Sequence, residues 1–407
     1  MSEGLDPLLV GVPVVVVLGV ACQLLGPRLR LPPILLLLVV GFAAGNLGAV
    51  DTDALLGDAL FPLVTLAVGV ILFEGALTLD RRELTGPLRR PLRRLLTLTV
   101  LVTWAAGAVL AWLVLGLDPQ LAVLLGAILV VSGPTVVTPL LGFVGDVGRV
   151  GSLLRFEGIL VDPVGAILAV LVFNGVVAGV RGEDTPGIVR AFGLTVGAGL
   201  LVGLVVAAVL VALLRLGGGP SSLDALLTLA AVLGAVVAAE ALREEAGLVA
   251  VTVLGIALAN QRVVDTARIE EFKATLGTLL SSVLFVLLSA RLTVDDLASV
   301  GWQGLVLVAA LVLLVRPLGV AAATVGSGFS RGERAFLGWV SPRGIIAAST
   351  ASVFALQLAD AGVPGAERLV PVTFVVILGT VLVASLTVVP VAGALGLRRT
   401  PAGPGGA

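Results

Sequence analysis

Residues 156–173 have the sequence FEGILVDPVGAILAVLVF, an apolar stretch that carries two carboxylates, Glu157 and Asp162. An aspartate at the centre of a membrane helix costs about 2.5–3.5 kcal/mol on insertion scales, and estimates for isolated charges are higher. A carboxylate is therefore retained at such a depth only where it is paired, hydrated or exchanging a proton. Two of them in one stretch predict a site at which ions or protons act within a membrane.

The composition of the whole chain predicts a polytopic membrane protein with an all-α fold. Hydrophobic residues make up 58% of the 407 residues, charged residues make up 13%, and the mean hydropathy is +1.17. These values lie outside the usual range of soluble domains. At about 20 residues per span, the chain has room for roughly a dozen helices. The net charge of −1 gives no indication of nucleic acid binding.

Few side chains of this protein can carry a proton near neutral pH. The sequence has no histidine or tyrosine and a single cysteine, Cys22, which excludes an imidazole relay, a histidine metal ligand and an intramolecular disulfide. Arginine stays charged, so proton exchange falls to aspartate and glutamate. No nucleotide loop of the type Gly-x-x-x-x-Gly-Lys-Ser/Thr occurs. We therefore expect neither an enzyme nor a nucleotide-driven pump, and no cofactor.

Thirteen apolar segments are predicted, and the charges between them support this number. When the loops are assigned to alternate sides, one side collects 17 lysines and arginines and the other collects 4. This positive-inside bias places the N-terminus outside and the C-terminus in the cytoplasm. The predicted segments are 8–25, 33–49, 58–78, 95–116, 119–143, 152–178, 188–214, 222–241, 246–261, 273–291, 301–326, 333–359 and 368–396.

The fifth and the twelfth segments contain residues that break helices. The fifth includes SGPTVVTP at 132–139, and the twelfth includes SPRG at 341–344. Proline removes a backbone donor, and unwound backbone is tolerated at membrane depth only where it lines a cavity or is buried in protein. Because the breaks are seven segments apart, we predict an inverted repeat with two broken helices crossing at the midplane, as in many secondary transporters. The alternative is that these prolines only kink their helices.

The two carboxylates of the sixth segment are predicted to have different roles. Their spacing of five residues turns them about 140° apart on a regular helix. Asp162 lies deeper, and we expect it to hold either a proton or a monovalent metal cation; the alternative is a structural pair with Arg316. Glu157 is expected to pair with Arg343 at the second break, and the alternative is an interfacial carboxylate near Arg155.

Polar residues of other segments extend this candidate site. Glu74, near the cytoplasmic end of the third segment, is either a carboxylate on a cation pathway or a solvated span end. The hydroxyls of Ser132, Thr135 and Thr138 lie at the first break, where each either binds an ion or bonds to its own helix. Asn174 is predicted to be a loop residue.

Four short motifs of this sequence resemble those of a known family. They are FEGALTLD at 73–80, SGP at 132–134, EGILVDP at 157–163 and PRG at 342–344. In this order, and with the thirteen-segment layout, they resemble the bacterial NhaP-type sodium/proton exchangers of the monovalent cation:proton antiporter superfamily. The resemblance covers essentially the whole chain.

The resemblance implies a homodimer in a bacterial plasma membrane, with sodium or potassium ions, protons and membrane lipid as partners and no nucleic acid. It also implies that Asp162 carries the ion and the proton, that Glu74 lies on the ion path, and that Glu157 pairs with Arg343. It divides a single transporter domain, residues 1–407, into a moving core within 95–178 and 301–396 and a dimer scaffold within 8–78 and 188–291.

The chain departs from the family's pattern at three places. Thr-Asp-Pro at the first break becomes Ser132-Gly133-Pro134, the Asn-Asp pair becomes Val161-Asp162, and a serine after the glutamate becomes Gly158. Fewer oxygen ligands leave the choice between sodium and potassium open. We expect an electroneutral exchanger without a cytoplasmic nucleotide-binding domain. The alternatives are a cation channel, a proton-coupled carrier of another small solute, and a membrane sensor without transport.

Overall fold

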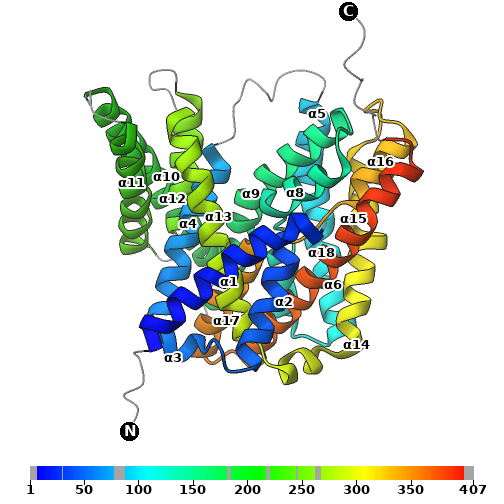
Figure 1. Cartoon of the computed structure of the whole chain (residues 1–407), viewed down its shortest axis with the longest axis horizontal. Coiled ribbons are helices and arrows are strands. Elements are labelled where there is room, and N and C mark those ends of the chain that lie inside the picture. The colour runs from blue at the N-terminus through cyan, green and yellow to red at the C-terminus, as the bar shows by residue number, and fades with distance from the viewer. Residues whose placement is uncertain are drawn as a thin grey trace, which may run out of the picture.

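A computed structural model describes residues 7–29, 31–77, 88–180, 185–216, 221–243, 246–261 and 267–397. Within these ranges the chain is helical throughout and contains no strand, which confirms the all-α prediction (Figure 1). The helices are α1 (Pro7–Leu29), α2 (Pro33–Asn46), α3 (Thr52–Leu56), α4 (Leu60–Leu77), α5 (Arg89–Arg94), α6 (Val100–Leu115), α7 (Pro119–Ile128), α8 (Pro134–Val144), α9 (Arg149–Val180), α10 (Thr185–Leu216), α11 (Ser221–Leu242), α12 (Ala246–Asn260), α13 (Ala267–Ala290), α14 (Val294–Ala310), α15 (Arg316–Ala323), α16 (Arg331–Trp339), α17 (Ile345–Asp360) and α18 (Leu369–Ala394). Short 3-10 turns, η1 (Gly57–Ala59) and η4 (Ala366–Arg368), and π-helical turns, η2 (Leu95–Thr99) and η3 (Leu311–Val315), join some of them.

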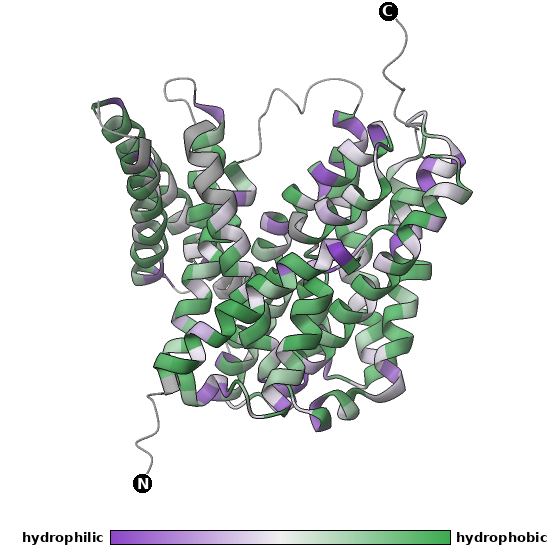
Figure 2. Cartoon of the chain, viewed as in Figure 1, coloured by the Kyte–Doolittle hydropathy of each residue, from purple (hydrophilic) through white to green (hydrophobic). Residues whose placement is uncertain are grey.

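The helices have the length and composition that a membrane requires. Eight stretches of the described chain are long and apolar enough to cross a bilayer, and five further apolar helices are 10–17 residues long. Figure 2 shows polar residues mostly at the upper and lower edges of the view, with apolar residues filling the band between. Each of the thirteen predicted segments overlaps at least one helix. The number of crossings stays a prediction.

Both predicted helix breaks are present, and they lie against each other. Helix α7 ends at Ile128 and α8 begins at Pro134, while α16 ends at Trp339 and α17 begins at Ile345. The Arg343 Nη1 atom of the second break donates to the Val130 carbonyl of the first, at 3.4 Å. The prolines therefore interrupt their helices instead of only kinking them, because the backbone stays non-helical over about five residues at each place.

The helix α9 is packed tightly against the first break. A Cβ built on Gly165 would lie 3.2 Å from the backbone nitrogen of Val131 and 2.7 Å from its Cγ2. A side chain on this glycine would therefore press on the unwound segment. The close approach places the part of α9 around Asp162 beside the residues that the proline has freed from helical bonding.

Two π-helical turns add to the symmetry of the breaks. The turn η2 lies in the fourth predicted segment and η3 in the eleventh, so they are seven segments apart, as the breaks are. The turn η2 contacts α15, and a Cβ on Gly319 would lie 2.9 Å from Thr99 Cγ2. Single π-helical turns often occur at functional sites. Here both turns contact α15, the helix that begins at Arg316.

One sequence-based expectation about the fold is wrong. Asn174, predicted to lie in a loop, is inside α9, which continues to Val180. The residues that follow Asn174 are apolar or small, so helical hydrogen bonding continues past one amide side chain. The sixth segment is consequently a single long helix of 32 residues that runs past both candidate carboxylates.

Candidate ion-binding site

The buried ion pair of α9 joins Glu157 to Arg316, not to Arg343. The Nη1 and Nη2 atoms of Arg316 donate to the two carboxylate oxygens of Glu157, at 2.5 and 2.7 Å. The two side chains are 7% and 4% exposed, so the pair is shielded from solvent. This parallel, bidentate geometry is the strong form of an arginine–carboxylate contact.

The predicted Glu157–Arg343 pair is therefore wrong, and so is the alternative pair of Asp162 with Arg316. The reason is the placement of Arg316, whose Nε donates to the Leu337 carbonyl at 3.2 Å. This bond turns the other edge of the guanidinium towards α9. Linear sequence gives no indication of which of two deep arginines is presented in this way, because both lie far from Glu157 along the chain.

Arg343 is buried at the crossing of the two breaks. Its backbone N–H donates to Thr380 Oγ1 at 3.2 Å, and its Nη1 donates to the carbonyl of Val130, just after α7. The end of α7 carries free carbonyls with partial negative charge, which favour a cation there. Arg343 therefore neutralises a helix end, and it shares one small cavity with Ser132, Glu157 and Arg316.

Asp162 lies on a different side of α9 from this arginine cluster. Its side chain is buried, 5% exposed, and takes a backbone hydrogen bond from Ser132. Its Oδ1 has no hydrogen-bond partner in the described part of the chain. Glu157 lines the cavity with the arginines, whereas Asp162 lines a larger one. The expected separation of the two carboxylates is thus present.

The cavity at Asp162, here called the inner cavity, brings together residues from six helices. Its volume is about 350 Å³. It includes Glu74, as the sequence analysis proposed, while the side chain of Thr135 lies outside the described residues. Its polar lining residues are Gln23 on α1, Glu74 on α4, Thr138 on α8, Asp162 on α9, and Thr278 and Ser281 on α13.

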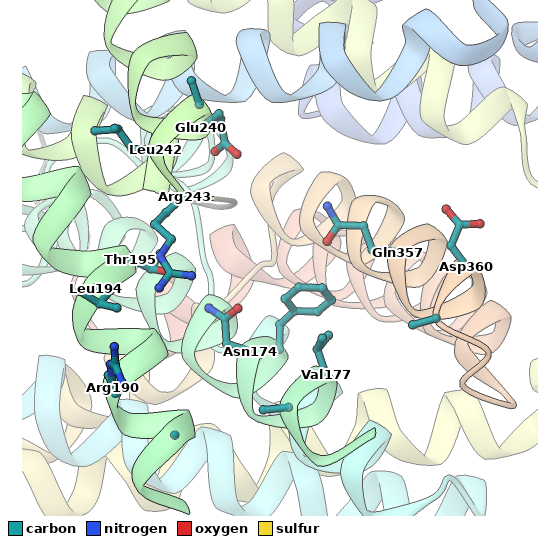
Figure 3. Close-up of a pocket in the computed structure, with 15 residues that line it drawn as sticks. Asn174, Val177, Arg190, Leu194, Thr195, Glu240, Leu242, Arg243, Gln357 and Asp360 are labelled. Carbon is teal, nitrogen blue, oxygen red and sulfur yellow. The ribbon is translucent and has the colours of Figure 1, made fainter. Parts of the chain in front are cut away.

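A second cavity, here called the outer cavity, lies near the C-terminal end of α9 (Figure 3). Its volume is about 950 Å³, and Asn174, which lines it, is twelve residues after Asp162, about 18 Å along the helix. Asp162 does not line this cavity. The rings of Phe173 and Phe354 stack at 4.2 Å between centroids at its margin. Its polar lining residues are Asn174, Arg190, Thr195, Glu240, Arg243, Gln357 and Asp360.

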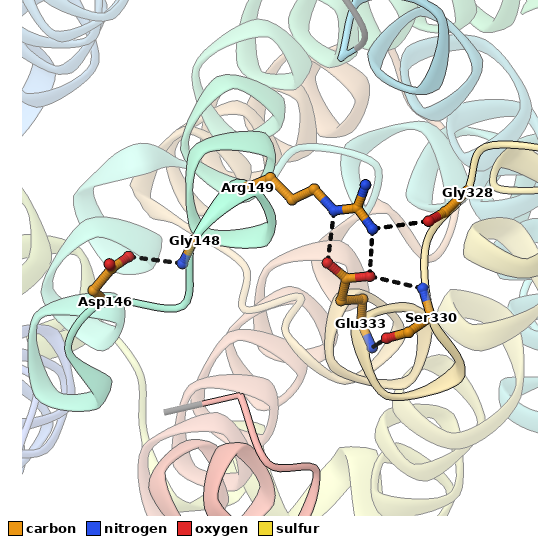
Figure 4. A network of polar contacts seen from close by, with 6 residues as sticks. All are labelled: Asp146, Gly148, Arg149, Gly328, Ser330 and Glu333. Carbon is orange, nitrogen blue, oxygen red and sulfur yellow. Dashed lines mark hydrogen bonds and ion pairs between the residues drawn. The ribbon is translucent and has the colours of Figure 1, made fainter. Parts of the chain in front are cut away.

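A polar network holds the beginning of α9 against α16 (Figure 4). The Nε and Nη2 atoms of Arg149 donate to the two carboxylate oxygens of Glu333, each at 2.7 Å, and Nη2 also donates to the Gly328 carbonyl. Glu333 closes a capping box with Ser330 at the first turn of α16. The helix that carries Asp162 is thus anchored to the first half of the second broken helix.

Sequence reasoning missed three polar residues that line the inner cavity. They are Gln23, Thr278 and Ser281, and each lies in a segment that the sequence analysis treated as plain span. The sequence pattern that could have predicted two of them is a polar stripe on one helix face. Thr278 and Ser281 are three residues apart, which places them one above the other. An amide such as Gln23 inside an apolar run was a second signal.

Comparisons with known proteins point to one family. Residues 14–394 match the family model described as "Sodium/hydrogen exchanger, transmembrane". A "K(+)/H(+) antiporter NhaP" of Alkalimonas amylolytica is 25% identical over 96% of this chain and 67% of its own length. A "K(+)/H(+) antiporter NhaP2" of Shewanella sp. is 28% identical over 88% of the chain and 62% of its own length. The chain thus spans about two thirds of the length of these relatives.

An archaeal protein is similar over more of its own length. The "Na(+)/H(+) antiporter 1" of Methanocaldococcus jannaschii is 27% identical over 84% of this chain and 82% of its own length. The solved structure of the sodium proton antiporter MjNhaP1 from the same organism superposes with a TM-score of 0.80 over 92% of this chain and 97% of its own, at 22% identity. This likeness confirms the fold.

Proposed function

Because this chain belongs to the sodium/hydrogen exchanger family, we propose that it exchanges protons for sodium or potassium ions across a membrane, with Asp162 as the exchanging group. Proteins of this family are transporters, not enzymes. The observation that carries the proposal is the position of Asp162: a buried carboxylate with one unpartnered oxygen that lines a cavity. Such a group in a membrane protein marks an ion or proton pathway.

The surroundings of Asp162 support an exchange of ligands at its carboxylate. A single carboxylate binds either a proton or an alkali cation, so the two ligands exclude each other. Glu157 does not compete, because both of its oxygens already accept hydrogen bonds from Arg316. Asp162 then transports one positive charge in each direction, either as a proton or as an alkali cation. This supports an electroneutral, one-for-one exchange.

Alternating access requires that Asp162 open to one side at a time. It lines the inner cavity and not the outer one, which corresponds to one of the two access states. In our proposal the core, within 95–178 and 301–396, moves against a scaffold within 8–78 and 188–291. Two core helices that contact each other, α9 and α17, line the outer cavity together with α10 and α11 of the scaffold.

The cellular setting is part of the same proposal. The 17-to-4 distribution of basic loop residues supports a cytoplasmic inner cavity and an outer cavity that faces outwards. We place the protein in a bacterial plasma membrane as a homodimer. Two long helices, α1 and α10, support a partner subunit, because only 22% and 28% of their most apolar windows are buried. Leu201 on α10, 61% exposed, lies on such a face.

The decisive test is ion-driven proton movement in proteoliposomes. We expect sodium or potassium to drive a pH change with the natural chain, and we expect Asp162→Asn to abolish it, because the amide binds neither a proton nor a cation in exchange. Lithium is measured beside the other two ions at several pH values. Thr373→Val on α18 is a suitable control, since Thr373 is buried away from both cavities.

Electrical recording separates this proposal from its main alternative. A cation channel conducts current without obligatory proton movement, whereas an electroneutral exchanger produces a pH change without net current. Ordinary exchange by Asp162→Asn, or current without a pH change in the natural chain, would reject the proposed function.

A further inference from the structure

Ser281 differs from the other buried serines of the described helices. Ser282, Ser289, Ser349 and Ser352 each donate to a backbone carbonyl of the preceding turn, which is a common way for a serine hydroxyl to be satisfied in a helix. Ser281 is only 6% exposed, yet its Oγ has no hydrogen-bond partner among the described residues. A buried polar atom of this kind requires an explanation, such as a bound ion.

Ser281 lines the inner cavity. This cavity also contains Glu74 of α4 and Asp162 of α9, whose Oδ1 is likewise unpartnered in the described chain. Two residues of one cavity, one on α13 and one on α9, therefore each have a buried oxygen without a partner among the described residues, and the two oxygens do not satisfy each other. Hard cations such as the alkali ions prefer oxygen ligands.

On α13, Gly277 leaves room for the Glu74 carboxylate one helical turn before Ser281. A Cβ built on Gly277 would lie 1.6 Å from Oε2 of Glu74 and 2.7 Å from its Cδ, so the carboxylate lies directly against the backbone of α13. Ser281 follows four residues later on the same helix face, about 6 Å along the axis. Only a residue without a side chain leaves room for the carboxylate at this place.

We propose that Glu74 and Ser281 form a subsite for a partly hydrated alkali cation on the scaffold wall of the inner cavity, where Gly277 leaves room for the Glu74 carboxylate. The cation passes from this subsite to Asp162 across the cavity. The inference rests on the proposed function and adds a second ligand group to it. It also gives a role to α13. Ser281 on this helix supplies an oxygen ligand, whereas Gly133 and Gly158 near the exchanging carboxylate have no side-chain oxygen.

The test compares serine variants of the full-length protein in proteoliposomes at fixed pH. We expect Ser281→Ala to raise the apparent KM for sodium or potassium about tenfold, equivalent to ~1.4 kcal/mol, with the maximal rate unchanged. Ser289→Ala is the matched control: it is the same substitution on the same helix, Ser289 is buried but does not line the cavity, and its hydroxyl already donates to the Phe285 carbonyl. We expect its KM to equal that of the natural chain.

Gly277→Ala tests the geometry of the subsite. The new Cβ must displace the Glu74 carboxylate, so we expect an increase in KM similar to that of Ser281→Ala. When Glu74→Gln is already present, Gly277→Ala should add little, because the displaced group has lost its charge. Cation-dependent thermal stabilisation of the purified protein provides a second readout, since a ligand stabilises the state that binds it. It should weaken in Ser281→Ala and stay in Ser289→Ala.

The outcomes separate the subsite from the exchanger. If the natural chain exchanges ions and Ser281→Ala keeps the same KM and the same cation-dependent stabilisation, the subsite is rejected and the exchanger stands. If the natural chain exchanges none of the ions, the proposed function fails. The thermal measurement then still decides the subsite, by the difference between Ser281→Ala and Ser289→Ala.

Discussion

At the residue scale, the two carboxylates of α9 show how the surroundings of a side chain decide its role. Glu157 is held by two hydrogen bonds from Arg316, and the guanidinium is held in turn by the Leu337 carbonyl. Asp162, five residues later, lines a cavity and keeps one buried oxygen without a hydrogen-bond partner among the described residues. A paired carboxylate is a fixed structural charge, whereas an unpartnered one can change its ligand.

The Glu157–Arg316 pair leads to a prediction about stability. Arg316→Ala leaves a buried, uncompensated carboxylate and should lower the free energy of unfolding by about 3–5 kcal/mol. Adding Glu157→Gln should restore part of this loss. Thermal unfolding in detergent, analysed as a double-mutant cycle, measures the coupling.

The same cycle with Arg343→Ala in place of Arg316→Ala is the matched control. Its coupling to Glu157 should be weaker, because Arg343 donates to the Val130 carbonyl instead. A stronger coupling of Glu157 to Arg343 than to Arg316 would contradict the pairing described above.

At the element scale, the close packing of α9 against the first break keeps Asp162 beside Ser132. Gly165 permits this contact, since its missing side chain leaves room for the backbone of Val131. The anchor between Arg149 and Glu333 holds the beginning of the same helix against α16. The long helix is therefore positioned at two places relative to the broken helices.

The contact at Gly165 predicts that a methyl group added there changes stability differently from one added at Gly142. Gly165→Ala should destabilise the protein by about 1–3 kcal/mol, because the new Cβ overpacks the unwound segment. Gly142→Ala in α8, where a Cβ meets no atom within 4 Å, should be neutral or stabilising by up to about 1 kcal/mol, since alanine has the higher helix propensity. Melting temperatures of the two variants test this, and equal values would show that the contact at Val131 yields freely.

At the scale of the whole molecule, two cavities lie along one helix, α9, one near its middle and one near its C-terminal end, and Asp162 lines only the first. The polar residues at both edges of the fold and the apolar band between them are what a bilayer requires (Figure 2). The first described helix begins near the lower edge of Figure 1, and the last one ends near the upper edge. Because Asp162 lines the inner cavity and not the outer one, access to it from the two sides is unequal in this state.

Labelling of single cysteines measures that inequality. Cys22 is the only cysteine, so Cys22→Ser gives a cysteine-free background. In this cysteine-free background, Thr278→Cys in the inner cavity should react with an impermeant thiol reagent only from the cytoplasmic side. Asp360→Cys in the outer cavity should react with it only from outside. Right-side-out and inverted vesicles provide the two sides. Labelling of both positions from one side would overturn the proposed orientation.

A large part of the fold follows from the sequence alone. Long apolar stretches predict helices because a bilayer leaves no other partner for the backbone, and prolines in Ser132-Gly133-Pro134 and Ser341-Pro342 predict breaks because they remove hydrogen bonds wherever they occur. The different surroundings of Glu157 and Asp162 were also predictable, since spacing on one helix determines direction. All of these are local properties of neighbouring residues.

The tertiary structure alone decided which distant residues meet. Arg316 and Arg343 are equally deep in apolar sequence, and only the packing of α15 and α16 shows that Arg316 faces Glu157. Likewise, Gly277 becomes notable only when α4 places Glu74 against it, and Ser281 only when it lines the same cavity as Glu74. Periodicity gives the direction of a side chain from its own helix, but its partner depends on how separate helices pack.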